Sequence, residues 1–94
     1  MLDTKKKKQL RTIAHSKSAL FQVGKEGISE NLIKTIGDSL EAHELIKISL
    51  LKTCPINVRE AAYDLAGNTH SEIVQIIGRT CVLYRRSKKN KLEM

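Results

Sequence analysis

The sequence predicts an α/β fold, a mixed four-stranded sheet with helices packed against it. Segments with apolar residues at helical spacing alternate with shorter segments in which every second residue is apolar. The last two short segments are separated by Gly78-Arg79 alone, which is typical of a two-residue hairpin turn. The expected order is therefore helix, strand, helix, strand, helix, strand, strand, within one compact domain.

The first half of the chain is expected to provide two helices and one strand. Residues 4–15 place apolar side chains at i, i+3 and i+4 behind a run of lysines and predict the first helix. Residues 19–23 predict a short strand. Ser29 is a suitable N-cap for the second helix, and Gly37 within that helix is expected to permit close packing.

The second half is expected to provide the third helix and the remaining strands. Residues 44–51 alternate as a strand. Asn57, followed three residues later by a glutamate, predicts the start of a helix, and Gly67 predicts its C-cap. Strands are then expected over 72–77 and 80–86, so a hairpin closes the fold.

The length of 94 residues fits a single domain over 1–94, with a core of about 4–86. The tail 87–94 is polar and basic and is expected to be frayed. No apolar run approaches the roughly 20 residues that cross a bilayer, and the lysine-rich start lacks the apolar segment of a signal peptide. We therefore expect a cytoplasmic protein without membrane contact.

The net charge of +7 is concentrated at the two ends of the chain. Residues 1–25 carry seven Lys and Arg against one Asp, and residues 79–94 carry six against one Glu. The middle, 26–78, carries four against eight acidic residues. Two basic ends that fold onto one side would form a surface for a polyanion. The alternative is a pair of solvated tails.

Residue types used in catalysis and metal binding occur without the spacing that such chemistry needs. No motif pairs a nucleophile with a base, and there is no phosphate-binding loop ending in Lys-Ser or Lys-Thr. Cys54 and Cys81 lack CxxC spacing and are expected to be free thiols. The three histidines are far apart in the sequence. We therefore expect no enzyme activity, cofactor, metal or small-molecule substrate.

The run Gly24-Lys25-Glu26-Gly27 lies between a predicted strand and a predicted helix start. Two glycines remove side-chain bulk, so a phosphodiester backbone could approach the peptide closely. The helix start adds N–H groups and partial positive charge, and Lys25 adds a mobile cation. A GxxG loop clamps the nucleic-acid backbone in KH domains. A tight turn without any ligand is the alternative explanation.

Three blocks of sequence resemble the CRM domain, and within it the stand-alone bacterial YhbY-type proteins. They read LRTIAHSKSALFQVGKEGISENLIKTI, LEAHELIKISLL and VQIIGRTCVLYRR, and they cover about Leu10 to Arg86. The resemblance implies a fold like the C-terminal domain of bacterial translation initiation factor three. It also implies RNA contact through the GxxG loop. Bacterial members of this family associate with precursors of the large ribosomal subunit, and plant relatives act in group II intron splicing.

The family's blocks match this chain residue by residue. The loop matches over 24–27, and the HELIK block matches over 43–47. The closing block matches at Gln75, Gly78, Leu83, Tyr84 and Arg85. One departure is Lys17-Ser18-Ala19, where the family often has a proline before the first strand. We expect that difference to loosen the entry to the strand without removing the function of the loop.

The resulting prediction is an RNA-binding protein that associates with precursor large-subunit rRNA during ribosome assembly. Aromatic residues are only 3% of the chain, so electrostatics and close backbone approach are expected to dominate binding. Lys47 is expected to face solvent or RNA, opposite Ile46 and Ile48. The predicted RNA-binding residues are Gly24, Lys25, Glu26, Gly27, Lys8, Arg11, Lys47, Arg79, Arg85 and Arg86. The alternatives are a general nucleic-acid-binding module for intron RNA or DNA, and an interaction protein for an acidic partner.

Overall fold

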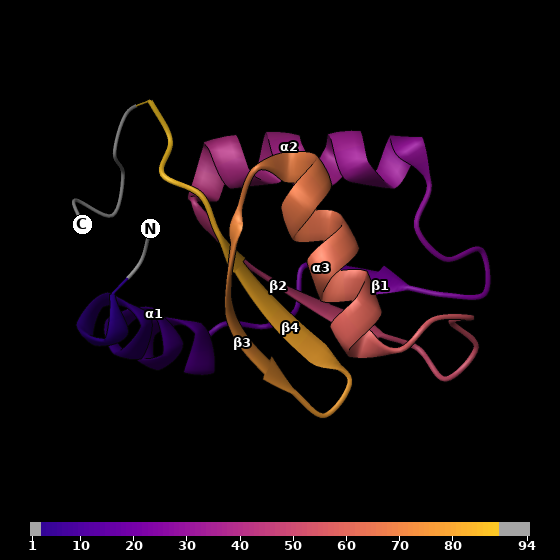
Figure 1. Ribbon diagram of the computed structural model, residues 1–94, viewed down its shortest axis with the longest axis horizontal. Coiled ribbons are helices and arrows are strands. Elements are labelled where there is room, and N and C mark those ends of the chain that lie inside the picture. The colour runs from indigo at the N-terminus through magenta and orange to yellow at the C-terminus, as the bar shows by residue number, and fades with distance from the viewer. Residues whose placement is uncertain (1–2, 89–94) are drawn as a thin grey trace.

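The computed structural model describes residues 3–88, whose helices and strands follow the predicted order (Figure 1). The elements are α1 (Thr4–His15), β1 (Phe21–Val23), α2 (Glu30–His43), β2 (Leu45–Leu50), α3 (Val58–Thr69), β3 (Glu72–Ile77) and β4 (Thr80–Tyr84). The α/β fold class and the mixed four-stranded sheet are confirmed.

The sheet has the strand order β1-β2-β4-β3. Strands β1 and β2 are parallel, with Val23 opposite Leu50, while β4 pairs antiparallel with both β2 and β3. Because β1 and β2 run the same way, the segments that follow them leave the sheet at the same end. Strands β1 and β3 form the two edges.

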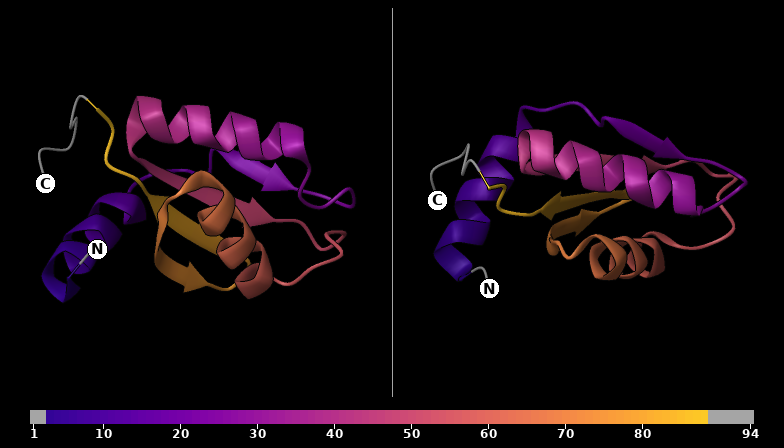
Figure 2. Two further views of the ribbon diagram at one scale, coloured as in Figure 1. Left: turned by 45° about the horizontal axis from the view of Figure 1, so that its top comes forward. Right: turned by 90° about the horizontal axis from the view of Figure 1, so that it is seen from above.

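The two faces of the sheet pack against different helices. On β2, Ile46 and Ile48 join a core with α2 and α3, whereas Leu45 joins a second cluster with Leu10 and Ala14 of α1. This alternation follows from side chains on a strand pointing to opposite faces in turn. Helix α1 therefore lies on the face opposite α2 and α3, toward one end of the molecule (Figure 2).

Strand β3 contains a bulge that serves both clusters. Ile73 pairs with Leu83 and Gln75 with Val82, so Val74 is an extra residue in the ladder. Ile73 and Ile76 both pack toward α2 and α3, although strict alternation over three residues would separate them. Val74 is buried against α1 instead.

Helix starts agree with the sequence, whereas two expectations about glycines are wrong. Ser29 and Asn57 both act as N-caps, accepting hydrogen bonds from the N–H groups of Leu32 and Glu60. Helix α3 continues past Gly67 because Thr69 is buried and bonds back to the carbonyl of Leu65; the left-handed C-cap is His70, with φ 55°. Gly37 makes no close approach, since a Cβ there would meet nothing within 4 Å.

The segment after β4 is attached to a buried carboxylate. Strand β4 ends at Tyr84, two residues before the predicted boundary. The backbone N–H of Arg85 donates to the carbonyl oxygen of Glu44 at 2.9 Å, and that of Ser87 donates to Glu44 Oε2 at 2.6 Å. Ser87 is buried, so the expected frayed tail does not begin there. The rest of the predicted tail, 89–94, lies outside the described residues.

Candidate nucleic-acid interface

The GxxG loop forms a hydrogen-bonded turn between β1 and α2. The N–H of Gly27 donates to the carbonyl of Gly24 at 3.0 Å. Gly27 has φ +67°, a left-handed conformation that L side chains rarely adopt. Ser29 then caps α2 two residues later. The sequence analysis placed this loop correctly between a strand and a helix start.

The two glycines differ in what they contribute to the fold. A Cβ on Gly27 would lie 3.3 Å from Pro55 Cγ, in addition to its unfavourable φ. A Cβ on Gly24 would lie 3.6 Å from Leu51 Cδ1, which is ordinary van der Waals contact. Gly27 is therefore needed by the turn itself, whereas the backbone tolerates a side chain at Gly24.

A shallow cleft of about 430 Å³ opens beside this loop. The GxxG loop forms one wall, and Asn31, Leu32 and Thr35 of α2 form the other. N–H groups in the first turn of a helix lack intrahelical acceptors and carry partial positive charge. Such a cleft suits an anionic backbone, while the exposed carboxylate of Glu26 opposes one.

Two further loops meet the GxxG loop at the same end of the molecule. The N–H of Leu51 donates to the carbonyl of Val23 at 2.9 Å, and that of Leu50 donates to the carbonyl of Arg79 at 2.7 Å. Lys52 and Arg79 line a neighbouring cleft of about 460 Å³. We call residues 24–29, 51–57 and 78–79 the loop end. Its exposed cations are Lys25, Lys52 and Arg79.

Lys52 was missed in the sequence analysis, although the parallel pairing of β1 and β2 accounts for its position. With Val23 opposite Leu50, the residues after both strands emerge side by side. A sequence-based assignment of parallel pairing would have placed Lys52 next to the GxxG loop. The charge pattern alone did not, because Lys52 lies in the acidic middle of the chain.

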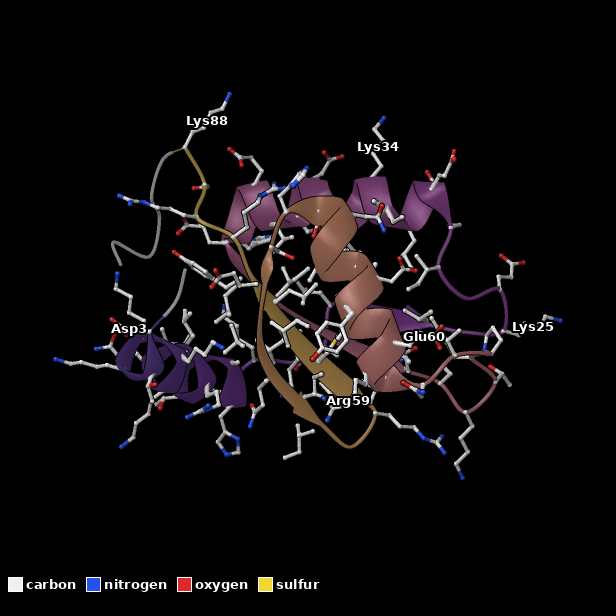
Figure 3. The ribbon with its side chains drawn as sticks, viewed as in Figure 1. Asp3, Lys25, Lys34, Arg59, Glu60 and Lys88 are labelled. Carbon is white, nitrogen blue, oxygen red and sulfur yellow. The ribbon has the colours of Figure 1, made fainter. Side chains whose placement is uncertain are left out.

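The other predicted cations gather at the opposite end of the long axis. Figure 3 shows Asp3, before α1, and Lys88 on the side of the molecule away from Lys25. The longest dimension is 36 Å. We call α1 together with residues 85–88 the basic end. It holds the predicted Lys8, Arg11 and Arg86, of which Lys8 and Arg86 are exposed and Arg11 is half-buried.

Two predicted RNA-binding cations have partners within the fold. Arg85 donates to the carbonyls of Gly37 and Thr69 at 2.7 and 2.8 Å, and also lies 3.6 Å from the carboxylate of Glu41. Lys47 Nζ lies 3.2 Å from the carbonyl of Lys17. The expectation that Lys47 faces solvent or RNA did not allow for α1, which covers that face of the sheet. We leave both residues out of the interface proposed below.

The remaining reactive side chains have structural surroundings. Cys81 is a buried free thiol, and burial raises its pKa to about 11. Burial, and then the nearby Glu44 carboxylate, raises the pKa of Tyr84. Within residues 3–88, no group of three or more His, Cys, Asp or Glu side chains could hold a metal ion. None of the helices in that range is long and apolar enough to cross a membrane.

The strand–GxxG–helix unit and the three clustered loops define a small α/β binding domain suited to a polyanionic chain. The chain belongs to the CRS1 / YhbY (CRM) domain family, whose model matches residues 2–85. This agrees with the resemblance found in the sequence, which covered about Leu10 to Arg86.

Relatives extend over nearly the whole chain. The probable RNA-binding protein YqeI of Bacillus subtilis is 47% identical over 91 residues, covering 97% of this chain and 95% of its own. An RNA-binding protein of Haemophilus influenzae is 30% identical over 93 residues, covering 99% and 94%. The solution structure of SAV1595 from Staphylococcus aureus is 48% identical, with a TM-score of 0.82 and coverage of 98% and 96%. The names of the first two relatives describe binding rather than catalysis.

Proposed function

We propose that this protein binds RNA through its loop end, and that its target is rRNA of the large ribosomal subunit precursor during assembly. Membership of the CRM family and the names of its relatives support RNA as the ligand. The ribosomal target comes from the resemblance to bacterial members of that family. Such a role places the protein in the cytoplasm as a binding factor without catalytic activity.

The observation that carries this proposal is that three loops, each with an exposed cation, lie at the end of the molecule where Gly24 stands beside the start of α2. Lys25, Lys52 and Arg79 come from three different loops of the loop end. Gly24 has no side chain to hold a phosphate away from the backbone. A phosphodiester lying in the cleft would meet N–H groups and the positive end of the α2 dipole. This mode of binding needs no stacking platform at the loop.

The basic end supplies a second, less directional attraction. Its exposed lysines and Arg86 belong to one helix and one terminal segment. Contacts of this kind raise affinity and association rate through counterion release and steering, and do not read sequence. In this proposal the basic end contributes to the affinity for RNA, and the loop end positions the RNA on the protein.

The test compares RNA classes and a matched pair of variants. Labelled fragments of large-subunit rRNA, small-subunit rRNA, intron RNA and duplex DNA are titrated with the protein, and lysate is sedimented to find the particles that the protein accompanies. We expect preference for large-subunit rRNA and co-sedimentation with precursor particles. The Lys25→Gln/Lys52→Gln/Arg79→Gln variant should lose both, whereas Lys34→Gln, an exposed change on α2, should keep both.

The alternatives give different results in the same experiment. Equal affinity for DNA and all RNAs would indicate a general nucleic-acid-binding module. Tight binding to intron RNA with no ribosomal particle would indicate a splicing role. Absence of RNA binding, with retention of an acidic protein from the lysate, would indicate an interaction protein and would overturn the proposal.

A further inference from the structure

A groove of about 710 Å³ follows the free edge of β3. Strand β3 provides its floor, α3 provides one wall, and Lys7 of α1 lies on the other side. Since α1 and α3 pack on opposite faces of the sheet, the free edge of β3 lies between Lys7 on one side of the groove and α3 on the other. None of the predicted RNA-binding residues lines it.

Tyr63 is the aromatic residue that this groove presents to solvent. Its side chain is 60% exposed, whereas Phe21 packs against the core and Tyr84 is buried. Gly67 follows one turn later on α3, and a Cβ there would meet nothing within 4 Å. The ring therefore stands beside open space in the groove. An exposed ring next to such space is suited to stacking a nucleic-acid base, whatever its identity.

Cations flank this ring along the groove. Arg59 lies one turn before Tyr63 on α3, toward the loop end, and Lys7 belongs to α1 in the basic end. The carboxylate of Glu72 also lines the groove, and that residue has an interaction of its own within the fold. The groove thus extends from Lys7 in the basic end to Arg59, which lies two residues after the loop end in the sequence.

We propose that a single RNA strand runs from the loop end along the β3 edge to the basic end, and stacks one base on Tyr63. The proposal rests on the RNA-binding function and extends it from the loop end to a continuous path. An extended peptide pairing with β3 is the other conceivable occupant. The bulge at Val74 interrupts the regular ladder that such a peptide needs, which favours RNA.

The first test uses tyrosine fluorescence, because the chain has two tyrosines and no tryptophan. Titration with a twelve-nucleotide oligouridylate should quench the emission of Tyr63 as a base stacks on it. Tyr63→Phe should retain affinity and lose most of the quenching. Tyr63→Leu should bind about tenfold more weakly, within the range of a lost stacking contact. Leu20→Ala, an exposed change before the opposite sheet edge, should bind as wild type does.

The second test fills the groove without replacing a cation or the ring. Gly67→Met places a side chain in the open space beside Tyr63 and should weaken oligouridylate binding several-fold while the protein stays folded. Gly37→Met makes the same change at an open glycine of α2 and should not affect binding.

The outcomes separate this proposal from the function on which it rests. If wild-type protein binds no RNA, the proposed function itself fails. If wild-type protein binds RNA and both Tyr63→Leu and Gly67→Met bind equally well, RNA binding stands and the groove is not its path. A peptide-binding groove would give that second result.

Discussion

The guanidinium of Arg85 donates a 2.7 Å hydrogen bond to the carbonyl of Gly37, which lies in the middle of α2. A second bond, of 2.8 Å, reaches the carbonyl of Thr69 at the end of α3. Carbonyls in the last turn of a helix lack intrahelical donors and carry partial negative charge. Arg85 therefore joins the end of β4 to both helices that cover one face of the sheet.

This geometry predicts that Arg85 matters more for stability than for RNA binding. Arg85→Ala should lower the free energy of unfolding by about 2–3 kcal/mol, because it leaves two carbonyls without their charged donor. Arg85→Lys should recover part of that loss, since one ammonium cannot replace the planar fork. Urea denaturation of both variants measures the effect.

The neighbouring Arg86 provides the matched control for Arg85. It is exposed, so Arg86→Gln should leave the free energy of unfolding nearly unchanged and weaken RNA binding modestly. If Arg85→Ala is as stable as wild type and loses RNA affinity to the same degree as Arg86→Gln, then Arg85 acts as an ordinary binding cation and the structural role is wrong.

The two loop glycines should separate folding from binding. Gly24→Asp should melt near the wild-type temperature, because the backbone has room there, and should bind RNA at least tenfold more weakly as its carboxylate repels phosphate. Gly27→Asp should instead lower the free energy of unfolding by about 1–2 kcal/mol, because Gly27 has φ +67° and a Cβ there would lie 3.3 Å from Pro55 Cγ.

Melting temperature and RNA affinity are measured on the same samples of these variants. Gly24→Ala is the control for charge: it adds a Cβ without a carboxylate and should cause a smaller loss of affinity. Full affinity in a folded Gly24→Asp protein would show that RNA does not approach the loop backbone at this position.

Local patterns in the sequence were sufficient to predict the fold class and the order of its elements. They were not sufficient to predict contacts between distant segments. Alternation and helix caps placed every element because they depend on neighbours within a few residues, as Ser29 and Asn57 illustrate. The Lys47 side chain bonds to the carbonyl of Lys17, which follows α1 and lies 30 residues away in the sequence, and no local pattern encodes that contact. The partners of Arg85 lie up to 48 residues away. Both were therefore predicted as surface cations.

The buried thiol of Cys81 predicts a loss of stability in alkaline solution. Its pKa is raised from 9.0 to about 11, so below pH 9 the thiol is protonated in both folded and unfolded chains. Between pH 9 and 11 the unfolded chain loses the proton while the folded protein keeps it. The free energy of unfolding should fall across this window, by up to about 2–3 kcal/mol from this residue. Tyr84, whose pKa is also raised, should add to the fall at the upper end.

Two measurements check the state of this thiol. Cys81→Ala should be less stable at neutral pH because of the cavity it leaves, yet should show a shallower fall between pH 9 and 11. A thiol-specific reagent should modify the half-buried Cys54 rapidly and Cys81 only on unfolding. Equal reaction rates of the two thiols in native protein would contradict the burial of Cys81.

The separation of the two cationic ends makes a quantitative prediction about salt. If about five cations contact phosphates, log K should fall with log salt at a slope of roughly −3 to −4 for single-stranded RNA. Each lost phosphate contact should lower the magnitude of that slope by about 0.7. The Lys25→Gln/Lys52→Gln/Arg79→Gln variant should therefore lower it by about 2. Substituting Lys8 and Arg86 at the opposite end should lower the magnitude of the slope by about a further 1 to 2. The two effects should add, because the two ends lie far apart along a 36 Å molecule.

Affinity measured across a salt series gives all of these slopes, with Lys34→Gln as the control expected to match wild type. A slope near zero for the wild-type protein would remove the electrostatic basis of the interface, and a loss confined to one end would mean that RNA occupies that end alone.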